Sequence, residues 1–141
     1  DYVKGDPSSW SAKATIDAAS INTDSAKRDD HLRAADFFDT AKCPTIEFRS
    51  LKVTGVKGNK GKLLGELTMH CVTKKIVLDL EVNGTLSTPQ GIKAGAVAKG
   101  TINRKDFGMA WNKTLDTGGL ILGEDVEILI DVEASAEAKK P

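Results

Sequence analysis

The last long alternating stretch of the chain decides its fold class: Val126-Glu127-Ile128-Leu129-Ile130-Asp131-Val132-Glu133-Ala134. Apolar side chains occupy every even position of this stretch, and the acids Glu127, Asp131 and Glu133 stand between them. Alternation with period two sends successive side chains to opposite faces of an extended strand. The stretch therefore predicts a β-strand with one buried face and one charged face.

Five segments further upstream repeat this alternation, and they cover residues 12–18, 46–56, 63–71, 76–83 and 92–103. The tight-turn signal Lys57-Gly58-Asn59-Lys60 predicts a hairpin between the second and third of them. A two-residue loop at this turn places Ile46 opposite Cys71 and Phe48 opposite Met69. Residues 84–91 begin and end with glycine and are expected to form a loop.

The first alternating segment is followed by Asn22-Thr23-Asp24-Ser25. Such side chains bond nearby backbone N–H groups and favour turns and helix N-caps, so a short helix is expected over residues 26–36. The connections between the other strands are mostly too short for crossover helices. This favours an all-β antiparallel sheet, closed into a barrel or folded into a sandwich. We expect one domain over residues 1–134 and a flexible tail over 135–141.

One predicted strand carries unusually small side chains on its inward face: Ala94, Ala96, Ala98 and Gly100. Small inward residues leave volume inside a curved sheet, and either larger residues from the opposing wall or a ligand fills it. Taken alone, the row favours filling by protein side chains.

The composition excludes some classes of function. Twenty Lys and Arg residues balance 20 Asp and Glu residues, and the aromatic content is 5%. A nucleic-acid-binding surface needs clustered basic residues or interleaved aromatic ones, so we expect no nucleic-acid partner. No apolar stretch approaches the ~20 residues that cross a bilayer, and no apolar signal core stands at the start, so a soluble chain is expected.

The residues that carry chemistry are sparse. His31 and His70 are the only imidazoles, and neither lies in a nucleophile-elbow motif. The paired carboxylates Asp29 and Asp30 stand among basic residues, as in a solvated ion-pair face. The two cysteines match no zinc spacing and no c-type haem motif. The sequence thus predicts no enzyme, no metal site and no cofactor.

Several of these segments together resemble the YceI-like family. They are Ile16–Thr23 with Arg28–Phe38, then Cys43–Phe48, the histidine-bearing turn Leu67–Lys74, Ile102–Met109, and Val126–Ala134. The resemblance implies a lipocalin-like antiparallel β-barrel with a short helix after the first complete strand. It also implies an internal apolar channel, residence in the periplasm or outside the cell, and binding of polyisoprenoids or related amphiphiles without catalysis.

The chain departs from the family pattern in two places. It begins where family members have already passed through an opening hairpin, so we expect Tyr2–Lys4 to correspond only to the end of the second strand and the N-terminal hairpin of the family to be missing from this sequence. Either the sequence is part of a longer polypeptide, or the gap is filled by another chain or left as an open cleft. An unpaired edge there favours homodimers, including dimers formed by strand exchange. Cys71 replaces a usual glycine and lies at the same end of the paired strands as Cys43. A disulfide between them and two free buried thiols are both consistent with this placement.

The resemblance places a ligand against the apolar inward positions. The candidate channel residues are Phe37, Phe38, Ile46, Phe48, Leu67, Met69, Leu78, Leu80, Ala96, Ala98, Ile102, Phe107, Met109, Ile128 and Ile130. Arg28, Arg33 and Arg104 are candidate head-group contacts, because guanidinium binds phosphate or carbonyl oxygen through a planar fork. Salt bridges to Asp29, Asp36 or Asp106 compete with that role and are favoured.

The leading hypothesis is non-enzymatic binding or transport of a long-chain amphiphile, with its tail inside. Polyprenyl lipids, isoprenoid quinones and fatty acids or amides remain alternatives, as do transport and stress protection as the purpose. A second hypothesis is a packed interaction domain that acts through its surface or open strand edge. A third is a periplasmic redox or metal-linked accessory that uses Cys43, Cys71 and His70.

Overall fold

The computed structural model describes residues 9–89 and 91–137. The elements follow one another as β1 (Lys13–Asp17), the 3-10 turn η2 (Ala18–Ser20), α1 (Ala26–Arg33), β2 (Thr45–Lys57), β3 (Lys60–Met69), β4 (Val72–Thr88), β5 (Gly91–Asn103), the 3-10 turn η3 (Arg104–Phe107) and β6 (Asp125–Glu137). The predictions for Tyr2–Lys4 fall outside the described residues.

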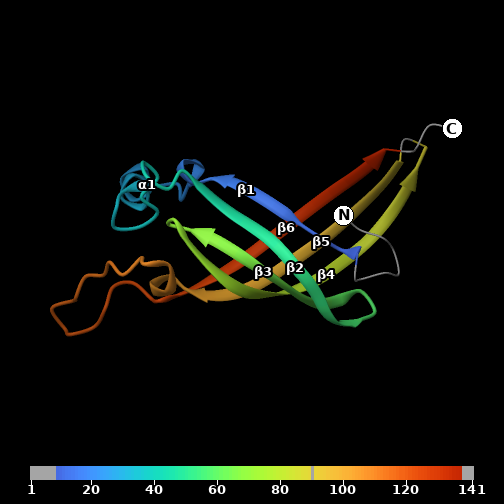
Figure 1. Cartoon of the computed structure of the whole chain (residues 1–141). Coiled ribbons are helices and arrows are strands. Elements are labelled where there is room, and N and C mark those ends of the chain that lie inside the picture. Colours follow the sequence, from blue (N-terminus) through green and yellow to red (C-terminus); the bar gives the residue numbers. More distant parts are fainter. Residues whose placement is uncertain (1–8, 90, 138–141) are drawn as a thin grey trace.

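The six strands form one antiparallel sheet in the order β1-β2-β3-β4-β5-β6. Each strand pairs with its neighbour in the sequence, and within the described residues β6 and β1 do not pair with each other. The sheet curls into a half-barrel, with α1 and the segment between η3 and β6 at one end (Figure 1). The predicted all-β, lipocalin-like architecture with one short helix is confirmed.

The predicted register of the β2–β3 hairpin is wrong by two residues, but its faces are right. Phe48 lies opposite Leu67 rather than Met69, and Cys71 lies beyond β3 in the turn to β4 rather than opposite Ile46. The cause is two irregularities in β2, between Ser50 and Lys52 and between Thr54 and Lys57, each of which adds one residue. One bulge exchanges the faces of a strand and two restore them, so the apolar sets still share the inner face.

The predicted loop over residues 84–91 is also wrong, because β4 continues to Thr88 and pairs with β5 up to the Thr88–Gly91 rung. A bulge between Val82 and Gly84 interrupts the alternation without ending the strand. Gly84 adopts φ +144°, which an L side chain rarely tolerates, and this explains the glycine at the bulge. Beyond it the apolar pattern changes face.

The ends of two other elements differ from expectation. β6 extends to Glu137, so residues 135–137 belong to a strand rather than to a tail, and the rest of the predicted tail lies outside the described residues. α1 ends at Arg33 instead of residue 36, since the backbone N–H of Ala34 closes a tighter turn onto His31.

The densest packing lies at the end of the half-barrel that η3 covers. Phe107 and Leu78 are each only 1% exposed and pack with Phe48, Met109 and their neighbours. Gly65 permits this, because a Cβ at that position would stand 2.4 Å from the Phe48 ring. The half-barrel is therefore solid at one end, and the candidate ligand site must lie elsewhere.

Candidate functional site

An open apolar trough of about 680 Å³ occupies the other end of the inner face. Five strands contribute to its walls, and ordinary small-molecule sites span roughly 300 to 1,000 Å³. The lining residues are Trp10, Ser11, Ala12, Val53, Leu63, Leu80, Val82, Thr85, Ser87, Ile92, Ala94, Gly95, Ala96, Val132, Ala134 and Ser135.

The trough exists because its floor is built from small side chains. Ala96 of β5 lies between Val82 of β4 and Val132 of β6, and on the next inward rung Ala94 pairs with Ala134. No aromatic residue from these three strands reaches into the space. The row of small residues therefore leaves a hollow at Ala94 and Ala96.

Among the described residues, no charged side chain lines the trough. Apart from the indole of Trp10 its polar side chains are hydroxyls, and Thr85 and Ser87 of β4 lie near the β4–β5 turn. The bulge before Gly84 turns these two hydroxyls inward. The arrangement offers apolar contact along the floor and neutral hydrogen-bonding groups toward one end, which suits an amphiphile with an uncharged head.

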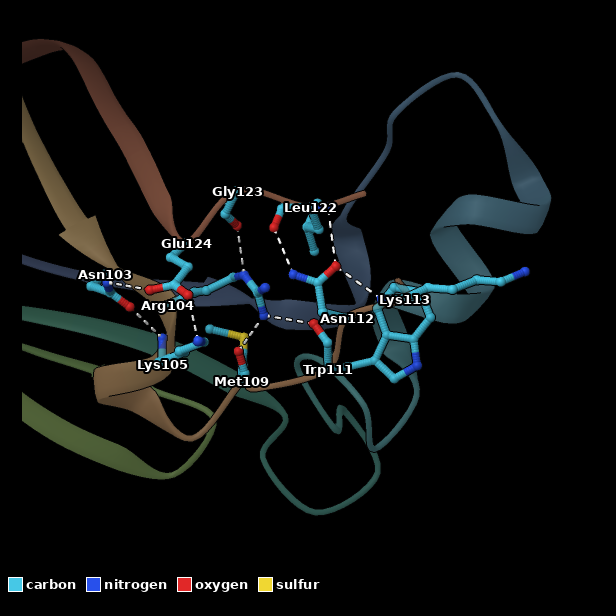
Figure 2. Close-up of polar contacts among 10 residues, drawn as sticks. All are labelled: Asn103, Arg104, Lys105, Met109, Trp111, Asn112, Lys113, Leu122, Gly123 and Glu124. Atoms are coloured by element: carbon cyan, nitrogen blue, oxygen red, sulfur yellow. Dashed lines mark hydrogen bonds and ion pairs between the residues drawn. The ribbon is translucent and has the colours of Figure 1, made fainter. Parts of the chain in front are cut away.

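The solid end is held by Arg104, which is 3% exposed and has no carboxylate partner among the described residues. Its Nε donates to the carbonyl of Gly123 at 2.8 Å, and one terminal nitrogen donates to the carbonyls of Met109 and Trp111. Figure 2 shows that this guanidinium donates to carbonyls near both ends of the segment that joins η3 to β6. The second terminal nitrogen is buried without a hydrogen-bond partner.

A surface ion pair lies beside the hydrogen bonds of Arg104. The ammonium of Lys105 and the amide of Asn103 both bond the carboxylate of Glu124 (Figure 2). The hydrogen bond from Lys105, followed by that from Asn103, holds the pKa of Glu124 below its ordinary value. The pair reinforces the same junction between η3 and β6.

The structure divides the fifteen predicted channel residues between the trough and the solid end. Leu80 and Ala96 line the trough. The others lie outside its lining: Phe48, Leu67, Met69, Leu78, Ala98, Ile102, Phe107 and Met109 form the buried cluster, Phe38, Ile46, Ile128 and Ile130 pack against it, and Phe37 contacts His31 and Trp111.

The three predicted head-group arginines lie outside the trough lining and bond protein groups. Arg28 donates to the hydroxyl and carbonyl of Thr23, and Arg33 donates to two carbonyls and pairs with Asp30 at 3.2 Å. In the described residues none of the three arginines pairs with the expected Asp29, Asp36 or Asp106, because their N–H groups donate mainly to backbone carbonyls. These arginines stabilise the irregular segments whose carbonyls they bind.

Cys43 and Cys71 form a disulfide with a Cα–Cα distance of 5.4 Å. Cys71 and His70 are the two residues of the β3–β4 turn, and both have positive φ, as a type I′ turn requires. The imidazole Nδ1 of His70 lies 2.8 Å from the carbonyl oxygen of Phe107. The turn is thus tied both to the segment before β2 and to η3.

Neither a metal site nor a membrane-spanning helix is found in residues 9–89 and 91–137. No three His, Cys, Asp or Glu side chains gather there as metal ligands would. Likewise no helix in these residues is long and apolar enough to cross a bilayer.

Most residues of the trough are absent from the predicted channel, although alternation places several of them on inward faces. Val82, Ala94 and Val132 were among them, but alternation does not show which end of a strand is plugged. Thr85 and Ser87 are absent from the predicted site because the alternation breaks at Gly84, so the sequence predicts a loop over residues 84–91. The available signal was the charge content, since Lys93 is the only charged residue in the whole stretch 82–98.

The fold and trough define a binding-type protein built on an open antiparallel half-barrel. Residues 1–134 match the family model described as the YceI-like domain, and the chain belongs to this family. It is 39% identical over 140 residues to a UPF0312 protein of Staphylococcus aureus strain N315, a match that covers 96% of this chain and 77% of that protein.

Solved structures of the family share this architecture. The crystal structure of a Campylobacter jejuni YceI protein matches with a TM-score of 0.80 and 35% identity, over 92% of this chain and 74% of that one. A mutant CJ YceI protein with a monobromobimane guest matches with a TM-score of 0.85 and 34% identity, over 98% and 79%. None of these three relatives carries an enzyme's name.

Proposed function

We propose that this protein is a non-enzymatic carrier that binds a long-chain amphiphile, such as an isoprenoid lipid, in the trough. The observation that carries the proposal is the lining itself, which is apolar along its floor and free of charge among the described residues. Each CH₂ group buried there contributes roughly 0.8 kcal/mol without needing a directional partner.

The head of the ligand lies at the hydroxyl-bearing end of the trough and is uncharged. Among the described residues, an anionic head beside Thr85 and Ser87 meets no lining cation, and an uncompensated charge near an apolar wall is costly. A carbonyl, amide or alcohol is satisfied by hydroxyl partners. This favours quinones, fatty amides and isoprenoid alcohols over polyprenyl phosphates.

The disulfide supports a periplasmic or secreted location for this carrier. Structural disulfides persist in oxidising compartments and are rare where thiol reductants are abundant. The Cys43–Cys71 bridge joins two segments that form the solid end of the fold. Lipid carriage between membranes is a task suited to such a compartment.

Extraction of the purified protein with organic solvent, followed by mass spectrometry, tests the proposal. Wild-type protein is expected to yield a long-chain neutral lipid, and Ala96→Phe, which fills the floor of the trough, is expected to yield at least tenfold less. Val97→Phe is the matched control, because Val97 follows Ala96 in β5 and its side chain therefore points to the opposite face, away from the trough. Clean extracts from folded wild-type protein, or equal lipid in Ala96→Phe, would overturn the proposal.

A second candidate, an interaction domain acting through the open edge, rests on the fact that β6 pairs with β5 alone in the described residues. The outer face of β6 carries Glu127, Asp131 and Glu133, and such charges discourage pairing with a second β6. A dimer by strand exchange would have to use the β1 side. Sedimentation velocity over a range of concentrations distinguishes the two candidates, since a carrier of this kind needs no dimer.

A further inference from the structure

The far end of the β4–β5 hairpin differs from the rest of the protein in charge. Residues 82–98 contain a single charged side chain, Lys93, in a chain whose charged fraction is 28%. That lysine is already paired with Glu133 at 3.1 Å. A stretch this poor in charge is unusual on the surface of a protein otherwise so rich in it.

This end of the hairpin also projects past the β2–β3 hairpin. Among the described residues, β3 pairs with β4 only from Val72 to Glu81, so Gly84–Thr88 has β5 as its sole strand partner. In Figure 1 the ends of β4, β5 and β6 extend beyond the other strands. The projecting part lies beside the hydroxyl-bearing end of the trough.

Both faces of the projecting hairpin carry an exposed aliphatic side chain. Ile92 is 52% exposed on the trough side. Leu86 stands between Thr85 and Ser87, which line the trough, so it points to the opposite face, where it is 62% exposed. An apolar partner has to surround this tip rather than cover one side of it.

We propose that the tip of the β4–β5 hairpin, residues 85–89 and 91–92, inserts into the surface of a lipid bilayer and thereby sets the mouth of the trough against the membrane. A bilayer receives both faces of a projecting tip at once, whereas a second copy or a protein groove covers one of them. The inference rests on the proposed function, because it supplies the route by which a membrane lipid enters and leaves the trough.

The backbone limits how deep the tip goes. Residues Gly84–Thr88 have an edge without a strand partner among the described residues, and peptide groups without partners are costly in the hydrocarbon core. The tip therefore stays in the hydrated interfacial layer, where amphipathic elements settle. The tip itself contains no charged residue, and the neighbouring Lys93 is paired with Glu133, so we expect binding to depend little on anionic lipids or on salt.

Co-sedimentation of the full chain with unilamellar phosphatidylcholine vesicles, with and without phosphatidylglycerol, tests this inference. We expect wild-type protein to bind both kinds of vesicle similarly in low and high salt, and Leu86→Glu to bind at least tenfold more weakly. Leu129→Glu is the matched control, because Leu129 is 67% exposed on the outer face of β6, away from the tip. Its binding should equal that of the wild type.

The outcomes separate this inference from the proposed function, because Leu86 does not line the trough. Lipid extracted from Leu86→Glu should equal that from the wild type. Wild-type protein that carries lipid yet ignores vesicles, or equal losses in Leu86→Glu and Leu129→Glu, would overturn the membrane contact alone. A wild-type dimer that Leu86→Glu converts to monomer without vesicles would assign the tip to self-association and overturn it too. Protein without extractable lipid would instead remove the proposed function.

Discussion

Removal of the Cys43–Cys71 disulfide should lower the free energy of unfolding by about 3.5 kcal/mol. The bridge closes a loop with a sequence separation of 28. The chain-entropy model assigns roughly 3 kcal/mol to a 15-residue loop and roughly 4.7 to a 100-residue loop, with logarithmic growth between them. For a chain of this size, that loss corresponds to a fall of about 10 °C in Tm.

The turn geometry adds a second, smaller expectation. Cys71 has φ +58°, where a glycine replaces an L residue with a gain of about 1 kcal/mol. The variant Cys43→Ala/Cys71→Gly should therefore be about 1 kcal/mol more stable than Cys43→Ala/Cys71→Ala.

Urea denaturation of the wild type and both double variants measures these differences, with reduced wild-type protein as a control for the thiols. The reduced wild type should match the Ala/Ala variant within experimental error. A loss below about 1 kcal/mol, or identical midpoints for the two double variants, would refute the reasoning from loop closure and turn geometry.

Three further perturbations probe the solid end of the half-barrel. Arg104→Lys should cost about 3 kcal/mol in urea denaturation, because lysine cannot reach all three carbonyls at once. A loss under about 1 kcal/mol would contradict the role of Arg104 in holding the segment between η3 and β6. Lys105→Met should raise the pKa of Glu124 toward its ordinary value in an NMR titration. Because the pKa of Glu124 is depressed in the folded state, the Lys105–Glu124 pair stabilises the fold above the unfolded-state pKa and loses its effect as pH falls through the folded-state pKa. An unchanged Glu124 titration in Lys105→Met would contradict this stabilisation. Gly65→Ala should cost more than about 2 kcal/mol in thermal unfolding, since its Cβ would overlap the Phe48 ring, and a neutral effect would show that the ring is free to move.

Alternation alone predicted the strands and their inner faces, because burial on one side of a sheet constrains every second residue. It was insufficient where strands carry bulges. The β2 bulges changed the Phe48 register by two residues while leaving its face intact, and the single bulge before Gly84 moved Leu86 to the outer face. Bulges depend on how the sheet curves, and the alternation of apolar and polar residues does not predict that curvature.

The candidate site was less predictable than the fold. Ala96 and Ala98 are alike in the sequence, both small and both inward, yet one lines the trough and the other is buried in the packed cluster. The difference is set by η3, which brings Phe107 over one end of the sheet and leaves the other end open. Such long-range placement cannot be obtained from the periodicity of a strand.

The most direct test of the central claim uses the two tryptophans as separate reporters. Trp10 lines the trough, whereas Trp111 packs against His31 and Phe37 at the solid end. Delipidated Trp111→Phe protein, titrated with geranylgeraniol, should show a saturable blue shift of the Trp10 emission, and Trp10→Phe protein should show no change. A response confined to Trp111, or none in either variant, would contradict lipid binding in the trough.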